Sequence, residues 1–336
     1  MSNKKFENMM LAPLFRLNVA KFRTGFVAEK QWRIFGAEAK LRGRIGFELK
    51  RKCCPFPGFR RKSCDGCTVA GNCLYCRLFS PLPEPPVTLP DGRSRHSPSP
   101  GRPFVIALDS PEDKAVLNPG DTGTAELTLF GPAIEHCALF LEAAVSAIAS
   151  FPLHAEEIGI VTPSSLTSGH SGTIGASDHP LAWPLSEWVS LPEPGTDPED
   201  GHGNTHGLKL WFVTPVRLVK SERLVYADVS FALIMKAVLR RLRDLRRAFF
   251  ADKDMGITGR TFYKAAEAVA ISENGLYWNR RKRHSFRQKQ DVFLNGFRGK
   301  ISFTGHLSPF VPLVRAGEIV HIGKGTSAGN GRIMVE

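Results

Sequence analysis

The last part of the chain, from Gly317 to Glu336, reads GEIVHIGKGTSAGNGRIMVE. Glycine reaches positive φ and lets another backbone approach closely, and successive N–H groups in a glycine-rich loop can bind an anion. Short β-branched runs at 319–322 and 333–335 are typical of strands. We therefore expect a glycine-rich loop between two strands, with Lys324 as a point charge beside a bound phosphate and His321 at its mouth. The glycines proposed to line it are Gly323, Gly325, Gly329 and Gly331.

The spacing of this loop excludes two common phosphate-binding motifs. No lysine is followed by a helix-starting Ser or Thr after a four-residue gap, as in nucleotide hydrolases. No long helix follows the glycines, as a dinucleotide fingerprint would require. A flexible C-terminal loop without a ligand remains the alternative interpretation.

Charge along the 336 residues is segregated, within a formal net charge of +13. Residues 1–62 hold 16 Lys and Arg against 4 Asp and Glu, and residues 236–300 hold 17 against 6, whereas residues 63–235 hold 9 against 20. Two basic blocks predict a polyanionic partner that both ends of the chain contact. Nucleic acid fits better than a membrane surface, because the blocks belong to structured segments. A basic but merely soluble surface is the alternative.

Targeting signals are not evident in the sequence. We find no continuous apolar run near 18 residues, so we expect no membrane span and no membrane partner. The first residues, MSNKKFENMML, lack an apolar core followed by a small-residue cleavage site. We therefore expect a cytoplasmic protein.

The segment 36–52 has the pattern of a basic amphipathic helix. Leu41, Ile45 and Leu49 recur at helical spacing and predict a buried stripe. The remaining positions carry many cations, among them the candidate RNA-binding residues Lys40, Arg42 and Arg44. A solvated helix surface is the alternative for this basic face.

Six cysteines lie between positions 53 and 76, and two pairs have C-x-x-C spacing, Cys64–Cys67 and Cys73–Cys76. In a chain without a secretory signal, paired C-x-x-C motifs indicate a metal and not disulfides. Four thiolates suit tetrahedral zinc, and an iron–sulfur cluster would also accept them. Loose reduced cysteines are the third possibility. The candidate ligands of a structural zinc are Cys54, Cys64, Cys67, Cys73 and Cys76.

The order of predicted elements repeats once along the chain. In the first half, strands at 11–23, 103–109, 121–131 and 158–161 alternate with helices at 36–52 and 133–150. The second half has strands at 208–219, 276–287, 296–306 and the C-terminus, a helix at 229–250 and an apolar segment at 308–316. Each half matches the βαββαβ, ferredoxin-like arrangement. We expect an α+β protein with two tandem ferredoxin-like (RNA-recognition-motif-like) domains at 1–162 and 207–336, a cysteine-rich metal-binding insertion at 53–76, and a Pro/Gly-rich linker at 163–206.

A second basic run, NRRKRHSFRQK, covers residues 279–289. Tyr277 and Trp278 precede these cations and Phe286 lies among them. Arginine forks suit phosphates, and aromatic faces suit splayed RNA bases. A strand with solvated basic residues is the alternative. The candidate RNA-binding residues here are Arg280, Arg281, Arg283, Ser285, Arg287 and Gln288.

Several of these segments together resemble one family. They are RHSFRQ at 283–288, GFRG at 296–299, LSPF at 307–310, HIGKG at 321–325 and GNG at 329–331. In the first half, LRG at 41–43, the cysteine cluster and LFGPA at 129–133 are similar too. With these motifs the chain resembles the CRISPR-associated RAMP endoribonucleases, which cut precursor CRISPR RNA at its repeats.

The resemblance implies that a hairpin repeat RNA is held across two ferredoxin-like domains. It implies metal-independent cleavage by the ribose 2′-OH, which leaves a 2′,3′-cyclic phosphate and a 5′-OH, so that any zinc would be structural. Proton transfer near neutral pH suits histidine, and a cation near the phosphate stabilises its charge. The candidate catalytic residues are His321, His284 and Lys324. Many members carry a histidine on the first helix, whereas residues 36–52 have none.

Two other functions fit the same sequence. The first is a non-catalytic RAMP subunit that holds guide RNA within a CRISPR effector complex, with other subunits as partners. The second is a zinc-knuckle DNA-binding regulator, which would prefer duplex DNA. Cleavage of a cognate repeat hairpin distinguishes the endoribonuclease from both.

Overall fold

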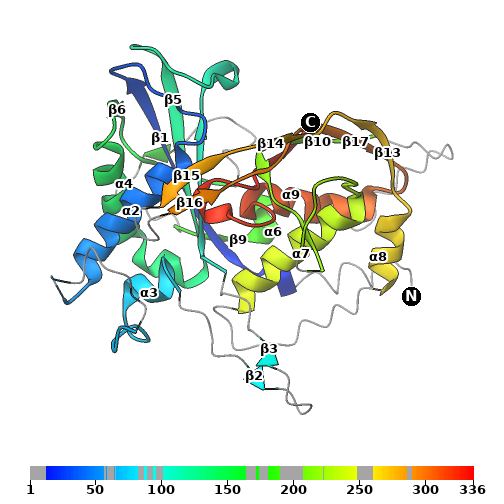
Figure 1. Cartoon of the computed structure of the whole chain (residues 1–336), viewed down its shortest axis with the longest axis horizontal. Coiled ribbons are helices and arrows are strands. Elements are labelled where there is room, and N and C mark those ends of the chain that lie inside the picture. Colours follow the sequence, from blue (N-terminus) through cyan, green and yellow to red (C-terminus); the bar gives the residue numbers. More distant parts are fainter. Residues whose placement is uncertain are drawn as a thin grey trace.

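The computed structural model describes residues 13–56, 58, 64, 66–81, 87–88, 94–95, 101–163, 172–173, 181–189, 207–221, 223–247, 260–285 and 290–336. Within them, two large antiparallel sheets lie side by side, one built from each half of the chain (Figure 1). Helices α2 and α4 cover the outer face of the first sheet, and α7 and α9 lie against the second.

The N-terminal sheet has the strand order β4-β5-β1-β7-β8, and β6 and β9 also pair with β1. Its strands are β1 (Asn18–Ala28), β4 (Phe104–Asp109), β5 (Thr122–Phe130), β6 (Leu153–Ala155), β7 (Gly159–Val161), β8 (Gly172–Thr173) and β9 (Trp183–Pro184). Its helices are α2 (Glu38–Cys53), α3 (Leu74–Leu78) and α4 (Cys137–Ile148), with 3-10 turns η2 (Pro111–Asp113) and η3 (Gly131–His136) and a small hairpin of β2 (Val87–Thr88) and β3 (Ser94–Arg95).

The C-terminal sheet has the order β13-β17-β10-β18, and β14 also pairs with β17. Its strands are β10 (Leu208–Val216), β13 (Ala270–Asn274), β14 (Tyr277–Asn279), β17 (Gly296–Thr304) and β18 (Ile333–Val335). Two hairpins stand outside it, β11 (Val219–Lys220) with β12 (Arg223–Leu224), and β15 (Lys282–Ser285) with β16 (Gln290–Phe293). The helical elements are α6 (Leu185–Trp188), α7 (Phe231–Arg247), α8 (Arg260–Glu267), α9 (Val311–Val320), η4 (Ser308–Phe310) and η5 (Thr326–Ala328).

Both halves place their principal strands in the same order, second-third-first-fourth along the chain. That order, with a helix after the first and third strands, is the split βαβ arrangement predicted from the sequence. The α+β class is confirmed, as are the helices expected at 36–52, 133–150 and 229–250.

Strand β5 shows how the two halves share one interior. Leu127 and Leu129 face the core of the N-terminal half, where they are buried with Phe104. Phe130, on the opposite side of the strand, is fully buried in the core that contains Phe212 of the C-terminal half. Both faces of the N-terminal sheet are therefore covered, one by its own helices and one by the second half.

Two regions of the C-terminal half differ from their predictions. The single strand expected at 276–287 is divided into β14 and β15, and β15 pairs with β16 outside the large sheet. Residues 319–322 were expected to be a strand, but Val311–Val320 form helix α9. Leu313, Val314 and Val320 are buried on one face at helical spacing. Gly317 lies inside this helix, where an added Cβ would lie 3.1 Å from Ile333 and 3.2 Å from Val238. Close packing against the sheet and α7 therefore overrides the β propensity of the segment.

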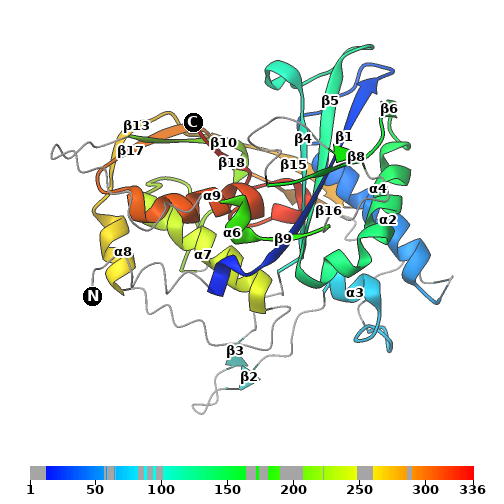
Figure 2. The same ribbon diagram turned by 180° about the vertical axis from the view of Figure 1, so that it is seen from behind.

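The predicted linker, 163–206, contains a structured part. Residues 181–189 form β9 and α6, and Leu185 N donates to Leu17 O at 2.8 Å. Leu185 and Trp188 are buried in the shared core, and Figure 2 shows α6 beside α9. Apart from 172–173 and 181–189, residues 164–206 lie outside the described ones. The division into domains at 162 and 207 stays a prediction.

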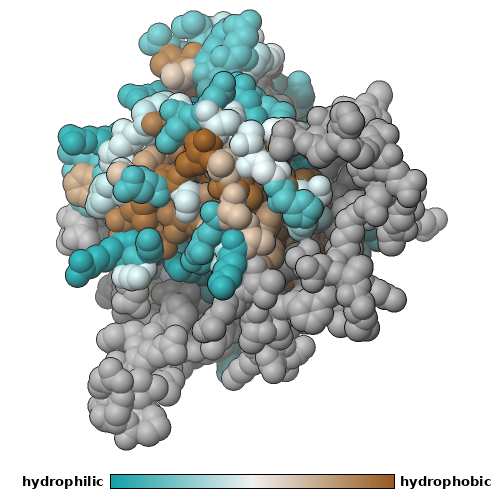
Figure 3. Space-filling model, turned by 90° about the vertical axis from the view of Figure 1, so that its right-hand side faces the viewer, coloured by the Kyte–Doolittle hydropathy of each residue, from teal (hydrophilic) through white to brown (hydrophobic). Residues whose placement is uncertain are grey.

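Two further features complete the fold. By length and composition alone, the segment Gly131–Ile148 could cross a membrane. Here it forms η3 and α4, and Phe140, Ala143 and Ile148 are buried in the N-terminal core. At the end of the molecule formed by the C-terminal half, an apolar area lies among hydrophilic residues (Figure 3).

Candidate functional site

Three of the sequence motifs meet at the first turn of α2. Ala39 of α2, Leu294 after the β15–β16 hairpin and Ala328 of the glycine-rich loop form one buried cluster. Gly329 has φ +84°, and a Cβ there would lie 2.3 Å from the Cβ of Glu38. Only glycine fits this contact, because a side chain would strain the backbone and overlap α2. The loop is thus seated on the first helix of the other half.

Buried polar contacts hold the same junction. Asn330 Nδ2 donates to Leu294 O at 3.2 Å. Arg281 Nη2 donates to Gly36 O at 2.6 Å and lies 3.5 Å from Glu38 Oε2, and the Arg281 side chain is only 9% exposed. Burial lowers the pKa of Arg281, although the nearby Glu38 carboxylate acts in the opposite direction. Burial also raises the pKa of Glu38. Arg281, predicted to bind RNA, therefore has its described contacts within the protein.

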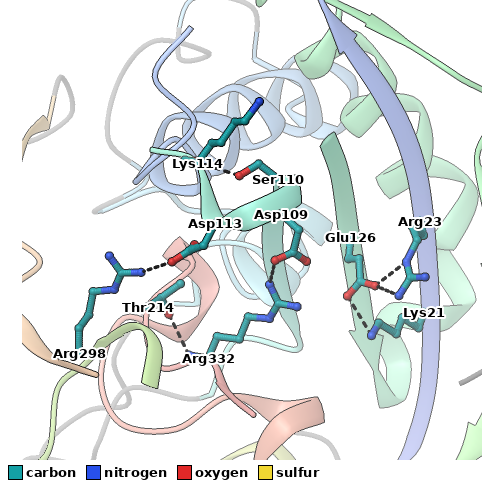
Figure 4. A network of polar contacts seen from close by, with 10 residues as sticks. All are labelled: Lys21, Arg23, Asp109, Ser110, Asp113, Lys114, Glu126, Thr214, Arg298 and Arg332. Atoms are coloured by element: carbon teal, nitrogen blue, oxygen red, sulfur yellow. Dashed lines mark hydrogen bonds and ion pairs between the residues drawn. The ribbon is translucent and has the colours of Figure 1, made fainter. Parts of the chain in front are cut away.

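A second set of ion pairs joins the halves beside this junction (Figure 4). Arg332 pairs with Asp109, and Arg298 Nη2 lies 3.2 Å from Asp113 Oδ2. The Arg298 guanidinium also lies 4.6 Å from the centre of the Phe35 ring. Arginines of the C-terminal half are thus paired with groups of the N-terminal half, which fixes how the two sheets meet.

Glu126 forms a compact cluster within the N-terminal sheet. Its carboxylate lies 2.9 Å from Lys21 Nζ and accepts a hydrogen bond from Arg23 Nε at 2.7 Å. Burial alone would raise the pKa of Glu126, but Lys21 and Arg23 outweigh it and lower this pKa to about 2. The carboxylate is therefore ionised throughout the physiological range.

His321 lies inside this charged interface and not at its surface. The residue follows α9 with φ 56°, and it is 3% exposed. Burial, with further contributions from Arg332 and Arg241, lowers the pKa of His321 to about 3. Its Nδ1 has no hydrogen-bond partner among the described residues. A neutral and enclosed imidazole is better suited to positioning the loop than to exchanging protons with solvent. The catalytic role of His321 stays a prediction.

The glycine-rich loop is a compact turn. Gly323, at φ +79°, lies so close to Arg217 that an added Cβ would be 2.5 Å from Arg217 O, and Lys324 N donates to that oxygen at 3.0 Å. A Cβ on Gly331 would lie 1.9 Å from Ile322 O. Residues 326–331 are buried, whereas Lys324 and Gly325 are exposed. The loop therefore presents the Lys324 ammonium at the surface from a fixed backbone.

The basic run forms a hairpin next to α2 (Figure 1). Arg280 and Lys282 are exposed, and Lys282 pairs with Asp291 at 3.0 Å. The backbone of Arg283, His284 and Ser285 lies in β15, where His284 is opposite Asp291. Arg287 and Gln288 lie outside the described residues.

Exposed aromatic residues accompany these cations. Tyr277 is 52% exposed, and Phe293, at the end of β16, is 57% exposed. Sequence reasoning noted Tyr277 but missed Phe293. Alternation along a hairpin next to a basic run was the signal that could have identified it.

On α2, the predicted basic face is partly available. Lys40 and Arg44 are exposed, whereas the Arg42 guanidinium lies 4.6 Å from the centre of the Phe79 ring. Arg33, in the loop before α2, is exposed and was missed by the sequence analysis. Its position before a basic helix was the available signal.

The cysteines gather at the other end of α2. Cys54, Cys64, Cys67, Cys73 and Cys76 line one pocket, together with Lys50 and Tyr75. All are free thiols. Among the described residues, no group of three or more His, Cys, Asp or Glu side chains lies in metal-binding geometry, so the metal-binding role of the cysteine-rich insertion stays a prediction.

Comparisons with known proteins give a family-model match for each half of the chain. Residues 210–333 match the family model of the CRISPR-associated endoribonuclease Cas6, and residues 17–153 match a model described as the AF_1859 N-terminal domain. No curated protein sequence matches the chain.

Two solved structures show the same fold. A product complex of Thermus thermophilus Cas6 has a TM-score of 0.54 at 14% identity, covering 95% of this chain and 100% of that one. A partial Cas6-RT-Cas1–Cas2 complex has a TM-score of 0.54 at 10% identity, covering 95% of this chain and 46% of that one. The C-terminal half of the chain is therefore similar to the CRISPR-associated endoribonuclease Cas6, and the two halves together share the fold of solved Cas6 structures.

Proposed function

We propose that this chain binds the repeat RNA of precursor CRISPR transcripts and cuts it without a metal ion to release guide RNA. The observation that carries the proposal is the junction of α2, the β15–β16 hairpin and the glycine-rich loop. Ala39, Leu294 and Ala328 bury these three elements against one another, although they are far apart in sequence. Each of them carries cations that suit RNA phosphates.

Exposed cations surround the junction on all three elements. They are Lys40 and Arg44 on α2, Arg280 and Lys282 at the hairpin, and Lys324 on the loop. Tyr277 on β14 and Phe293 at the end of β16 have exposed rings that suit unstacked bases. An RNA hairpin with single-stranded flanks would therefore find both phosphate and base contacts here.

The proposed reaction is transfer of the phosphodiester to the neighbouring 2′-oxygen. The 2′-OH loses a proton and attacks phosphorus, the bond to the 5′-oxygen breaks, and that oxygen takes up a proton. The products are a 2′,3′-cyclic phosphate and a 5′-OH. Lys324 supplies positive charge at the phosphate, and His284 is the proposed proton-transfer residue. His321 is assigned a positioning role, because it is buried and neutral.

A variant series tests these roles with labelled repeat RNA in EDTA. His284→Ala and Lys324→Ala should slow cleavage by about 100-fold or more, while RNA affinity changes only a few-fold. His321→Ala should lower thermal stability, and any loss of cleavage should follow that loss of fold. Normal cleavage by His284→Ala, with no cleavage by a stably folded His321→Ala, would overturn this assignment.

A second function is favoured by one observation. Helix α2 carries no histidine, although many similar proteins do. A chain without that group could hold guide RNA and leave it uncut, within a complex of CRISPR proteins. Tight binding of repeat RNA that stays intact at neutral pH would support this second function. Duplex DNA is the control ligand, and preference for it would favour the zinc-knuckle regulator.

A further inference from the structure

We propose that the cysteine insertion is a zinc site, in which Cys64, Cys67, Cys73 and Cys76 bind one ion that fastens α3 to α2. This inference does not depend on the RNA-cleaving function. It concerns the end of α2 opposite the junction described above. All four proposed ligands are among the residues that the structure describes.

Both C-x-x-C pairs have local backbone suited to a shared ion. Cys67 N donates to Cys64 O at 3.1 Å, which closes a tight turn over the first pair. Gly66 takes the positive φ of +73° that this turn needs. Cys73 is the N-cap of α3, and Cys76 follows one turn later on that helix. Residues three apart on a helix lie on one side, so each pair presents two thiols together.

The two pairs also approach each other. The thiol of Cys76 lies near those of both Cys64 and Cys73. Cys67 lines the same pocket. The thiols of both C-x-x-C pairs therefore lie around one pocket, and metal binding would couple to the ordering of this part of the chain.

Cys54 and Cys53 are the excess cysteines. Cys54 lines the pocket, but its thiol donates to Phe56 O at 3.5 Å. Cys53 is absent from the described lining of this pocket. The structure therefore reduces the five candidates of the sequence to the four residues of the C-x-x-C pairs.

Four thiolates are the ligand set of a structural tetrahedral zinc, and they would also hold an iron–sulfur cluster. Zinc is the ion proposed here, and the test below distinguishes it from the cluster.

The pocket is joined to α2 by a row of side chains. Lys50 of α2 places its Nζ 5.6 Å from the centre of the Tyr75 ring, and Tyr75 stacks on Phe79 at 5.4 Å. A Cβ on Gly46 of α2 would lie 2.2 Å from the Phe79 ring, so this helix and the end of the insertion are in close contact. The Arg42 guanidinium of α2 also lies over the Phe79 ring. An ion that orders α3 would therefore also hold the surface of α2.

The test measures metal content and ligand type in the purified full-length chain. We expect about one zinc per chain by mass spectrometry of the metal, and a cobalt-substituted protein with the intense visible and charge-transfer bands of tetrahedral thiolate coordination. The double variant Cys64→Ser/Cys67→Ser should lose both signals. Cys137→Ser, on α4 and away from the pocket, is the matched control and should keep them.

A second measurement covers variants that fail to fold. Removing zinc from the wild-type chain with a chelator should speed proteolysis within residues 53–76, and adding zinc back should restore protection. Loss of the cobalt spectrum in Cys54→Ser would contradict the assignment of the four ligands. Iron with acid-labile sulfide in place of zinc, or a folded wild-type chain that binds neither zinc nor cobalt, would overturn the proposal.

Discussion

The first helices of the two halves, α2 and α7, look alike in sequence and are used differently. Both follow the first strand of their half, and both are rich in Lys and Arg. On α2, Lys40 and Arg44 are exposed. On α7, Arg241 and Arg246 are only 6% and 8% exposed. A similar number of cations in sequence therefore includes exposed residues at the start of α2 and buried arginines on α7.

The difference has a physical cause in the contact between the halves. Arg241 donates to Val320 O and to Arg102 O, each at 3.1 Å, and Arg102 belongs to the N-terminal half. Burial lowers the pKa of Arg241 to about 10, so the guanidinium remains charged near neutral pH. A long side chain that supplies several donors can join two carbonyls across an interface. The charge of α7 thus contributes to assembly of the halves.

The largest effect is expected from breaking this contact on α7. Arg241→Ala removes the donor of a buried hydrogen bond to Val320 O and of a part-buried one to Arg102 O. It should lower the free energy of unfolding by about 2–4 kcal/mol. Arg240→Ala, at the next and exposed position, should change it by less than about 0.5 kcal/mol. Urea unfolding of both variants measures the difference. Equal effects would show that the two arginines are used alike.

The next effect concerns the seat of the glycine-rich loop on α2. Gly329→Ala should lower the free energy of unfolding by about 1–3 kcal/mol, because the new Cβ meets Glu38 and the backbone has positive φ. Gly43→Ala, on the open side of α2 with nothing within 4 Å, is the control. It should stabilise the chain by about 0.5–1 kcal/mol. Thermal and urea unfolding measure both variants. A neutral Gly329→Ala would contradict the close contact of the loop with α2.

The pH dependence of stability tests the buried contact of α7, because His321 lies near Arg241 of this helix. The folded-state pKa of about 3 lies below the ordinary value of 6.5, so the unfolded chain binds the proton more tightly. Stability should therefore fall as the pH drops below about 6.5, by about 1.4 kcal/mol per pH unit, until the folded pKa is reached.

A matched pair isolates this contribution. His321→Gln should flatten the slope of stability against pH between about 6.5 and 4, as measured by urea unfolding at each pH. His306→Gln changes an exposed histidine and should leave the slope as it is. A slope unchanged in His321→Gln would contradict the buried, neutral imidazole.

The smallest effect is expected on the exposed side, at α2. Arg44→Glu should weaken repeat-RNA binding about 10-fold and reduce the dependence of log affinity on log salt by about one unit, as expected for a lost phosphate contact. Arg240→Glu makes the same charge change on α7, and there we expect a smaller loss of affinity. Titrations at several salt concentrations measure both. Equal losses would mean that only total charge matters.

Much of the fold was predictable because local pattern and tertiary packing agree. Leu41, Ile45 and Leu49 of α2 are all buried on one face as the helical spacing indicated. The segment 319–322 was not predictable, because its β-branched residues favour a strand while the packing of Gly317 requires a helix. Likewise, no local pattern shows that Trp188 belongs to the core, since its partners come from distant segments.

The site was predictable as a set of motifs but not as an arrangement. The loop, the hairpin and α2 were identified separately, and their contact through Ala39, Leu294 and Ala328 depends on how the halves meet. His321 shows the limit most clearly. In sequence it lies between Val320 and Ile322, just before the glycines of a loop, whereas burial and the nearby cations Arg332, Arg241 and Lys21 determine its charge state.

The central claim is cleavage of repeat RNA by the chain itself without a metal ion. The most direct measurement incubates the wild-type protein with labelled repeat RNA from its own locus in EDTA and identifies the ends of the products. We predict a single cut that leaves a 2′,3′-cyclic phosphate on one fragment and a 5′-OH on the other. RNA that is bound but stays intact, or cleavage that requires a divalent ion and leaves a 5′-phosphate, would contradict the account.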